Sequence, residues 1–190
     1  MKSSISLAFF FFLLFAFSAA NDVVYDIDGQ PLTFGDRYQI IPALRGKGGG
    51  LELGKTGNDS CPISVVQARS EVNSGLQVDF LIGLPVINIT EGTPLIIRFP
   101  DERPSCVRNP TAWDVVEEFP QGWSVKLEYF EIRFGPFRIK KVGQYDYKII
   151  YCRSSDNVCA DLGIKNRRLI VRDGNPFLVR FKKAIGSSAE

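Results

Sequence analysis

The distribution of β-branched and aromatic residues constrains the fold of this chain more than any other feature. These residues gather in short runs separated by Gly, Pro, Asn and Asp, and no window shows the 3.6-residue spacing of an apolar helix face. The runs expected to form strands are Val24–Ile27, Arg37–Ile41, Leu51–Leu53, Ser64–Val66, Leu76–Phe80, Leu95–Phe99, Ser124–Tyr129, Phe137–Lys140, Tyr145–Tyr151, Arg168–Val171 and Phe177–Phe181. Many short strands with turns between them predict an all-β sandwich or barrel.

A weak internal repeat favours the barrel. Tyr38-Gln-Ile-Ile and Tyr147-Lys-Ile-Ile begin 109 positions apart, and Leu95-Ile-Ile-Arg-Phe lies near the midpoint between them. A period of about 55 residues fits three times into the chain. The motif Gly-x-Pro-(Leu/Phe) also occurs three times, at uneven spacing, starting at Gly29, Gly92 and Gly174. Three units of four short strands predict a β-trefoil of twelve strands with pseudo-threefold symmetry.

The first 20 residues have the pattern of a secretory signal peptide. Lys2 supplies a positive charge, Ile5–Phe17 is almost wholly apolar, and Ser18-Ala19-Ala20 offers small residues for cleavage. The apolar run is too short for a membrane span, and no later run approaches that length. We therefore expect one exported, monomeric domain over residues 21–190, located in the extracellular space (apoplast) or the vacuole, with no membrane partner. The formal net charge of +2 is too weak for nucleic acid binding.

The four cysteines, Cys61, Cys106, Cys152 and Cys159, can pair in three ways. Cys152 and Cys159 stand at the ends of a short polar loop, which suits a local bridge and leaves Cys61 to pair with Cys106. In the chain-entropy model these bridges stabilise the fold by about 2.5 and about 4 kcal/mol, respectively. With no CxxC motif and no histidine, we expect no zinc site.

Several classes of function are excluded by residues that the chain lacks. Without histidine there is no Ser-His-Asp or Cys-His arrangement, and bridged cysteines provide no thiolate nucleophile. The adjacent carboxylates Glu117-Glu118 and Asp101-Glu102 are read as solvated side chains, because neighbours on a strand face opposite ways. The segment Gly49–Thr56 matches a phosphate-binding pattern, but its surroundings cannot open a helix. We expect no enzyme activity, no cofactor and no metal.

The segment Gly83-Leu84-Pro85-Val86-Ile87-Asn88 is the candidate functional element. It lies between two β-type runs, with Cys61 upstream and Cys106 downstream, so a bridge between these cysteines would cross-link its flanks. A segment held in this way could be presented to a partner as a rigid loop, which binds without first losing conformational freedom. Asn88-Ile-Thr within it, and Asn58-Asp-Ser upstream, are sequons for N-glycosylation.

The chain resembles the Kunitz soybean trypsin inhibitor family over the whole of residues 21–190. The matching stretches, in order, are Val24–Leu32, Tyr38–Ile40, Gly48–Gly50, Cys61–Gln67, Thr90–Leu95, Trp113–Glu117, Tyr147–Cys152, Asp161–Gly163, Arg167–Leu169 and Pro176–Phe181. The resemblance implies a β-trefoil with bridges Cys61–Cys106 and Cys152–Cys159. It also implies a protease partner. A serine protease is the first expectation, since members of this family typically inhibit that class, although some relatives inhibit cysteine or aspartic proteases.

Inhibitors of this family present one loop to the protease in a substrate-like conformation. Counting from Cys61 and from Glu91 places the reactive bond at Pro85-Val86, where trypsin-directed members carry Arg or Lys before the bond. The resemblance therefore implies an inhibitor whose target is not ordinary trypsin. Family members commonly brace the loop with an Asn side chain from the N-terminal segment. The matching residue here, Phe34, cannot do so, and a glycan on Asn88 would obstruct docking.

Alternatives to this reading remain at the level of sequence. Arg153, within the Cys152–Cys159 loop, is the best basic residue for a second inhibitory loop, followed by Arg45 and Lys47. The same scaffold could instead serve a non-inhibitory protein of defence, storage or signalling. The single Gln121-Gly122-Trp123 resembles the QxW motif of ricin-type trefoil lectins, so carbohydrate binding is the third possibility.

Overall fold

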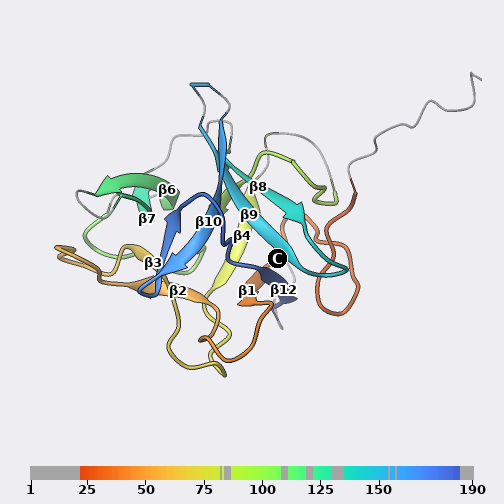
Figure 1. The fold of residues 1–190 in the computed structure, drawn as a ribbon, viewed down its shortest axis with the longest axis horizontal. Coiled ribbons are helices and arrows are strands. Elements are labelled where there is room, and N and C mark those ends of the chain that lie inside the picture. Colours follow the sequence, from red (N-terminus) through yellow and green to blue (C-terminus); the bar gives the residue numbers. More distant parts are fainter. Residues whose placement is uncertain are drawn as a thin grey trace, which may run out of the picture.

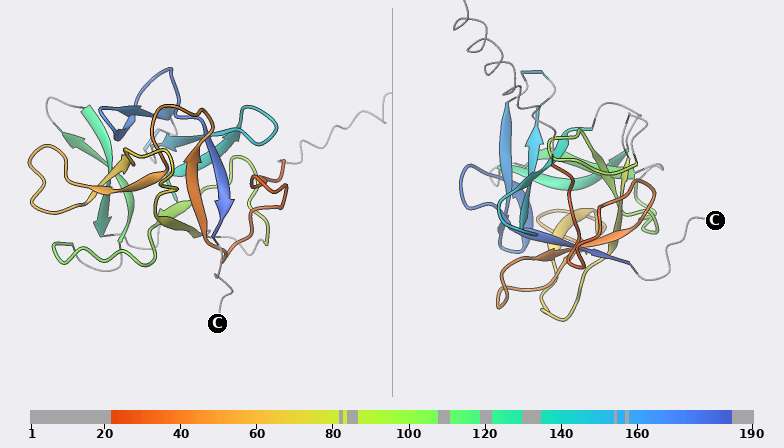
Figure 2. Two further views of the ribbon diagram at one scale, coloured as in Figure 1. Left: turned by 90° about the horizontal axis from the view of Figure 1, so that it is seen from below. Right: turned by 90° about the vertical axis from the view of Figure 1, so that its right-hand side faces the viewer.

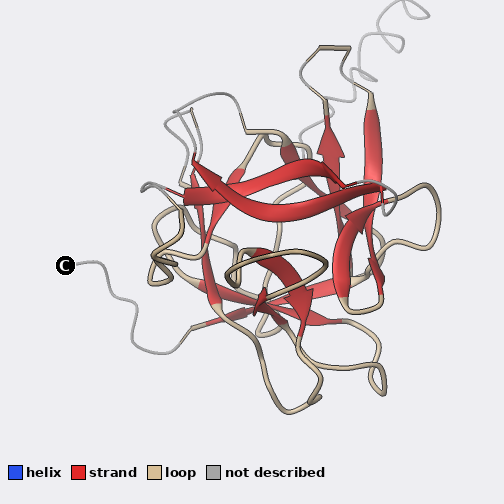
Figure 3. Ribbon diagram, turned by 90° about the vertical axis from the view of Figure 1, so that its left-hand side faces the viewer, coloured by secondary structure: helices blue, strands red, loops and turns tan. Residues whose placement is uncertain are grey.

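The structure, a computed structural model, describes residues 22–81, 83, 87–107, 111–118, 122–129, 135–153, 155–156 and 158–184. These residues form strands, turns and loops, and none of them lies in a helix (Figure 3). Accordingly, no helix capable of crossing a membrane is present among them. The predicted signal peptide, residues 1–20, lies outside the described residues.

Twelve strands make up the described fold, as the repeat predicts (Figure 1). They are β1 (Tyr38–Pro42), β2 (Leu51–Gly54), β3 (Ser64–Gln67), β4 (Gln77–Leu81), β5 (Ile96–Arg98), β6 (Thr111–Glu118), β7 (Gly122–Tyr129), β8 (Phe137–Lys141), β9 (Tyr147–Cys152), β10 (Cys159–Lys165), β11 (Arg168–Val171) and β12 (Val179–Lys183).

Pairing between the strands gives the β-trefoil. β1, β4, β5, β8, β9 and β12 close into a ring, in which the bridge Leu95↔Phe137 joins the β5 and β8 regions. The other six strands form the hairpins β2–β3, β6–β7 and β10–β11. Their second strands, β3, β7 and β11, each pair with the other two, which is the expected threefold arrangement. These hairpins lie together on the left in Figure 1 and in the left panel of Figure 2.

The sequence repeat corresponds to equivalent places in the three units. Tyr38 begins β1, Tyr147 begins β9, and Leu95 directly precedes β5; all three side chains are fully buried. The recurring Gly-x-Pro motif also has one conformation, because Gly29, Gly92 and Gly174 all have φ between +68° and +75°. Only glycine adopts this left-handed backbone without a steric penalty, so each motif marks a turn.

Some strand predictions were wrong. Val24–Ile27 contains only one isolated bridge, Tyr25↔Pro31, because its backbone N–H groups bond to separate partners: Val24 to Ile89, Asp26 to Gln30 and Ile27 to Phe181 of β12. Conversely, β6 and β10 were not predicted, since acidic residues, glycine and alanine interrupt their apolar patterns. Gly49–Thr56 contains β2 and opens no helix, so its phosphate-loop pattern is accidental.

The interior of the barrel is filled by large side chains from all three units. Phe80 packs on Tyr38 and Phe181, with ring centroids 6.1 and 5.9 Å apart, and Trp113 packs on Phe99 and Phe137 at 5.5 and 6.1 Å. Tilted and edge-on contacts of this kind are the preferred geometry of aromatic pairs. The core therefore fixes the strands from which the surface loops project.

Both predicted disulfides are present. Cys61 pairs with Cys106, and Cys152 pairs with Cys159. The second bridge joins directly opposed residues of β9 and β10, whose hairpin extends beyond the rest of the ribbon at the top of Figure 1. The Cys61–Cys106 bridge encloses β3, β4 and β5, together with the candidate segment, which lies between β4 and β5 in the sequence.

Candidate functional site

The downstream arm of the candidate segment, Ile87–Thr90, is held as extended backbone against the N-terminal segment, residues 22–34. Thr33 pairs with Asn88, and Val23 pairs with Thr90, in antiparallel bridges. The supporting backbone hydrogen bonds run from Phe34 N–H to the Ile87 carbonyl (2.8 Å), from Ile89 N–H to the Leu32 carbonyl (2.8 Å), and from Val24 N–H to the Ile89 carbonyl (2.9 Å). The two supporting stretches also bond to each other, through Leu32 N–H and the Val24 carbonyl (2.8 Å), so the arm is one of three mutually bonded extended segments outside the named strands.

Two buried tyrosines fix the N-terminal segment in turn. The Tyr38 hydroxyl accepts a hydrogen bond from Thr33 N–H, and the Tyr147 hydroxyl accepts one from Tyr25 N–H, both at 2.9 Å. Burial raises the pKa of both phenols above its ordinary value, so they remain neutral at physiological pH. The residues that reveal the sequence repeat therefore also anchor the support of the candidate segment.

On the upstream side, strands β4 and β5 close the loop that carries the segment. Their register pairs Leu81 with Ile96, so the loop leaves and re-enters the barrel at adjacent points. Across the same strand pair, Arg98 forms a two-point ion pair with Asp79, with Nε 2.9 Å from Oδ1. Hydrogen bonding to Asp79 raises the pKa of Arg98 above its ordinary value, which keeps this clamp charged.

Two large apolar side chains are exposed where the arm meets the N-terminal segment, beside the polar and exposed Asn88. Ile87 is 77% exposed and Phe34 is 46% exposed. Because Thr33 is opposite Asn88, Phe34 is opposite Ile87, and opposed residues of antiparallel strands share a face. Of the five residues predicted for the reactive loop, the structure describes Ile87 and Asn88; Leu84, Pro85 and Val86 lie outside the described residues.

Phe34 supports the arm in a way that the sequence did not suggest. Its side chain offers no hydrogen bond, as predicted, but its backbone N–H bonds to the Ile87 carbonyl. The position thus supports the loop through the main chain, and any residue other than proline could provide this bond. Pairing of main-chain groups leaves no trace in side-chain identity, which is why the sequence analysis missed it.

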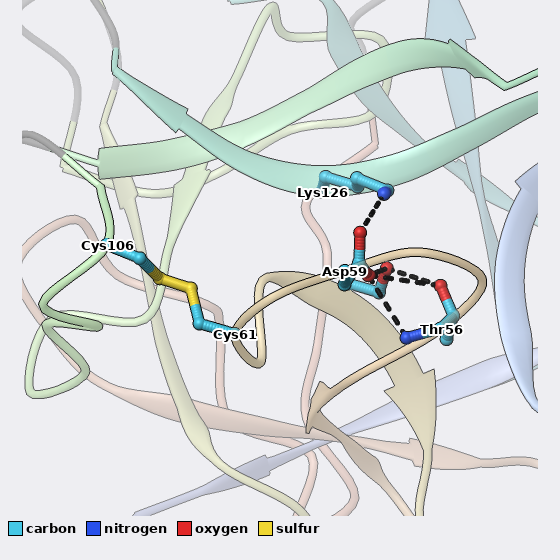
Figure 4. The surroundings of a disulfide bond; sticks show 6 residues. Thr56, Asp59, Cys61, Cys106 and Lys126 are labelled. Atoms are coloured by element: carbon cyan, nitrogen blue, oxygen red, sulfur yellow. Dashed lines mark hydrogen bonds and ion pairs between the residues drawn. A yellow bond between two sulfur atoms is a disulfide. The ribbon is translucent and has the colours of Figure 1, made fainter.

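A buried ionic cluster fixes the loop that leads into Cys61 (Figure 4). Lys126 on β7 contacts Asp59 at 2.5 Å and Glu118 of β6 at 2.6 Å, and its side chain is only 8% exposed. Glu118 also pairs with Arg168 of β11. The reading of Glu118 as solvated was therefore wrong, because the strand pairing places two cations beside it. Figure 4 shows Asp59 and Cys61 on the same loop, which the disulfide joins to the segment that carries Cys106.

The charge state of Asp59 follows from this arrangement. Burial alone would raise the pKa of its carboxyl, but hydrogen bonds from Lys126, Ser64 and the Thr56 backbone N–H outweigh burial and lower it. Asp59 is therefore ionised at neutral pH and links its loop to β3 and β7. The cluster combines strands of three hairpins, a juxtaposition that cannot be read from sequence spacing.

Arg153, the alternative inhibitory residue, lies at the base of the β9–β10 loop. Its guanidinium Nε is 3.6 Å from Asp156 Oδ1, and both side chains are largely exposed. Together with Trp123, Tyr151 and Val158 it lines a small cleft of about 110 Å³. Arg153 is accessible, but its charge is shared with Asp156 and it belongs to a different surface element from Ile87.

The asparagine of each sequon is exposed. Asn58 lies in a turn closed by the bond from Asp59 N–H to the Thr56 carbonyl, and Asn88 lies in the arm.

No cluster of three or more His, Cys, Asp or Glu side chains suited to a metal ion occurs among the described residues.

Comparison with known proteins identifies the scaffold. The family model described as "Trypsin and protease inhibitor" (legume Kunitz type) matches residues 24–183. A trypsin inhibitor of Bauhinia variegata is 41% identical over 171 residues, covering 86% of this chain and 97% of that protein.

Two solved complexes have the same fold. Soybean trypsin inhibitor bound to porcine pancreatic trypsin is 34% identical, with a TM-score of 0.74 over 85% of this chain and 99% of that chain. A Bauhinia bauhinioides kallikrein inhibitor, with one arginine replaced by alanine and bound to human kallikrein 4, is 34% identical, with a TM-score of 0.73 over 86% and 98% of the two chains. These relatives are inhibitors rather than enzymes, and this chain belongs to the Kunitz-type family of plant protease inhibitors.

Proposed function

We propose that this protein inhibits a protease through the segment 84–88, and that its target accepts an apolar residue rather than Arg or Lys. The observation that carries the proposal is the downstream arm, in which the Ile87 side chain is exposed while the Ile87 carbonyl and the Ile89 backbone are hydrogen-bonded. An extended segment fixed in this way resembles a substrate strand, and its prior ordering lowers the entropy cost of binding.

The specificity follows from the residue at the reactive position. By the residue count from Cys61 and from Glu91, Pro85 occupies the position at which trypsin-directed inhibitors of the family carry a cation. A binding pocket that carries a charge, such as that of trypsin, discriminates against a residue without the opposite charge. For comparable sites with buried polar groups, the discrimination is on the order of 10⁴. A kallikrein complex of a relative that has lost one arginine supports the view that a member of the family can engage a serine protease with fewer basic residues.

The exposed apolar pair formed by Phe34 and Ile87 supports the same conclusion. Large apolar groups at the centre of an interface provide most of its binding energy when they enter a pocket. Serine proteases with apolar pockets, such as chymotrypsin and elastase, are the first candidates, and cysteine and aspartic proteases belong in the same panel.

The test compares Asn88→Gln with the double variant Pro85→Arg/Asn88→Gln, so that a glycan masks neither protein. We expect the single variant to inhibit trypsin weakly or not at all, and the double variant to gain trypsin inhibition of at least about 100-fold, since the pocket charge regains a partner. Inhibition constants for trypsin, chymotrypsin, elastase, papain and pepsin provide the measurement.

Three results would contradict the proposal. A nanomolar constant against trypsin for the protein with Pro85 would refute the predicted specificity, and Arg153→Gln would then test the second loop. A correctly folded double variant that remains inactive against trypsin would refute the register of the reactive bond. A protein inactive against the entire panel would favour a non-inhibitory role for the scaffold.

A further inference from the structure

A second surface feature shares no residue with the candidate segment. It is a groove of about 460 Å³, formed by the end of β1 and the loop after it, by the end of β3, by β10, and by the loop between β11 and β12. Its size falls within the range of 300–1,000 Å³ typical of small-molecule sites. The residues on which the argument depends are Leu44, Lys47, Gln67, Ile164, Arg172 and Phe177.

One of the residues that line this groove carries an unsatisfied donor. Gln67 is only 5% exposed, and its buried Nε2 atom has no hydrogen-bond partner among the described residues. Its backbone is fixed, because its N–H donates to the Arg167 carbonyl (2.7 Å) and its carbonyl accepts from Arg167 Nε (2.8 Å). Buried donors are nearly always paired, so an unpaired one on a residue that lines the groove is the donor that a bound acceptor would satisfy.

The place of Gln67 is enforced by the adjacent loop. A Cβ added at Gly48 would lie 3.3 Å from Gln67 Nε2 and 2.7 Å from the Ala68 carbonyl. Gly48 has φ of +112°, a conformation that favours glycine, so the loop can pass closely over the amide. The Gln67 amide is therefore held against the loop that bears Lys47.

The remaining polar groups of the groove have matching chemistry. Lys47 and Arg172 line it, and neither side chain forms an ion pair with a described residue. No carboxylate is among the lining residues, whereas Leu44, Ile164 and Phe177 provide apolar surface. Two unpaired cations and an unpaired amide donor favour an oxyanion, and the apolar wall favours an organic group attached to it.

We propose that this groove binds a small amphipathic anion, an aryl or alkyl carboxylate. The oxyanion accepts hydrogen bonds from the Gln67 amide and from Arg172 or Lys47, and the hydrocarbon part packs on Leu44 and Phe177. Binding satisfies the buried donor and offsets one of the two positive charges, while leaving the reactive segment untouched.

The experiment uses 3-phenylpropionate as the probe, titrated into the protein by calorimetry. The matched ligands are 3-phenylpropionamide, which keeps the shape without the charge, and acetate, which keeps the charge without the aryl group. We expect saturable one-to-one binding of 3-phenylpropionate, with each matched ligand at least about tenfold weaker, because charge-assisted hydrogen bonds and apolar burial both contribute.

Variants locate the site. Arg172→Gln should weaken binding about tenfold through the loss of one charge-assisted bond, whereas Lys140→Gln, on β8 and outside the groove, should leave it unchanged. Adding the probe should shift the side-chain amide resonances of Gln67 in a ¹⁵N–¹H spectrum, a readout that does not depend on the fold tolerating a substitution at this buried residue.

Several outcomes would overturn the proposal. The first is the absence of saturable binding of 3-phenylpropionate. Equal affinity for 3-phenylpropionamide would show an apolar cleft only, and equal affinity for acetate or inorganic phosphate would show a simple anion site only. An unchanged affinity in Arg172→Gln would show that the groove is not the binding site. Protease inhibition should be the same in Arg172→Gln as in the unmodified protein, which separates this site from the proposed inhibitory segment.

Discussion

Among single residues, Lys126 of β7 has the most extensive buried ionic contacts, with partners on a loop and on another strand. Its ammonium neutralises Asp59 on the loop before Cys61 and Glu118 on β6, inside a cluster that water scarcely reaches. Removing one member of a buried ion pair leaves an uncompensated charge, which is far more costly than losing an exposed pair.

We therefore predict that Lys126→Met lowers the free energy of unfolding by about 3–5 kcal/mol. Arg37→Gln, which breaks the exposed Arg37–Asp101 pair, should change it by less than about 1 kcal/mol. Urea unfolding followed by tryptophan fluorescence measures both. Similar losses in the two variants would show that the cluster is no better shielded than the surface.

The same cluster sets the acid limit of stability. Since the pKa of Asp59 is lowered on folding, its contribution is complete above the ordinary carboxyl pKa of about 4 and is lost as the pH falls through the lower folded value. Without histidine, no unperturbed side chain titrates between about pH 5 and 8.

We accordingly predict a melting temperature that is constant from pH 5 to 8 and falls below about pH 4. Asp59→Asn should flatten part of this acid fall, at the expense of stability at neutral pH, whereas Asp101→Asn should leave the profile unchanged. Melting curves recorded by circular dichroism would decide the matter; a steep change between pH 5 and 8 would contradict the prediction.

Among elements, the N-terminal segment has the largest unexpected role. It has almost no regular secondary structure, yet it supplies both neighbours of the arm Ile87–Thr90. Its own position depends on the hydroxyls of Tyr38 and Tyr147. Order in the candidate site therefore originates in two tyrosines of the barrel.

We predict that Tyr147→Phe and Tyr38→Phe each lower stability by about 1–3 kcal/mol, since each leaves a backbone N–H unpaired. Both should also weaken inhibition, because the arm loses its rigid neighbour. Tyr25→Phe, whose hydroxyl has no bond to another described residue, is the matched control. If the protease is bound equally well by all three variants, the arm does not depend on the segment.

Patterns at the scale of elements also explain what the sequence could and could not reveal. Strands such as β9 were recognised, here as the predicted run Tyr145–Tyr151, because β-branched and aromatic residues dominate them. β10 was missed because it contains Cys, Ala, Asp and Gly, and it is a strand because it lies between β9 and β11. Backbone pairing of this kind depends on neighbours that are distant in the chain, so local composition does not report it.

At the scale of the whole molecule, the threefold repeat was predictable because each unit must supply the same core layer. The disulfide pairing was predictable because short loops and family resemblance agree. The Glu118–Lys126 cluster and the groove around Gln67 were not, since each combines residues from three or more strands or loops. Sites of this type form only when the hairpins meet.

The predicted signal peptide makes glycosylation relevant to the whole molecule. Asn58 and Asn88 are both exposed, but only Asn88 belongs to the proposed contact surface. We predict that protein produced in a eukaryotic secretory system carries glycans at these sites and inhibits its target less than enzymatically deglycosylated protein does.

Asn88→Gln should restore inhibition and Asn58→Gln should not, with peptide mass mapping to establish occupancy. Restoration by Asn58→Gln alone would place the contact surface near the Cys61 loop instead.

The Cys61–Cys106 bridge has a consequence for what happens after the proposed bond is cut. The bond lies within a covalent ring, since the two cysteines are 45 positions apart and flank it. Hydrolysis would therefore open the ring without separating its ends, leaving two polypeptides joined by sulfur and by the β4–β5 pairing. The new amine and carboxylate would stay at high effective concentration, so resynthesis of the peptide bond becomes an intramolecular reaction. Nicked and intact protein would then form an equilibrium that the protease itself catalyses in both directions.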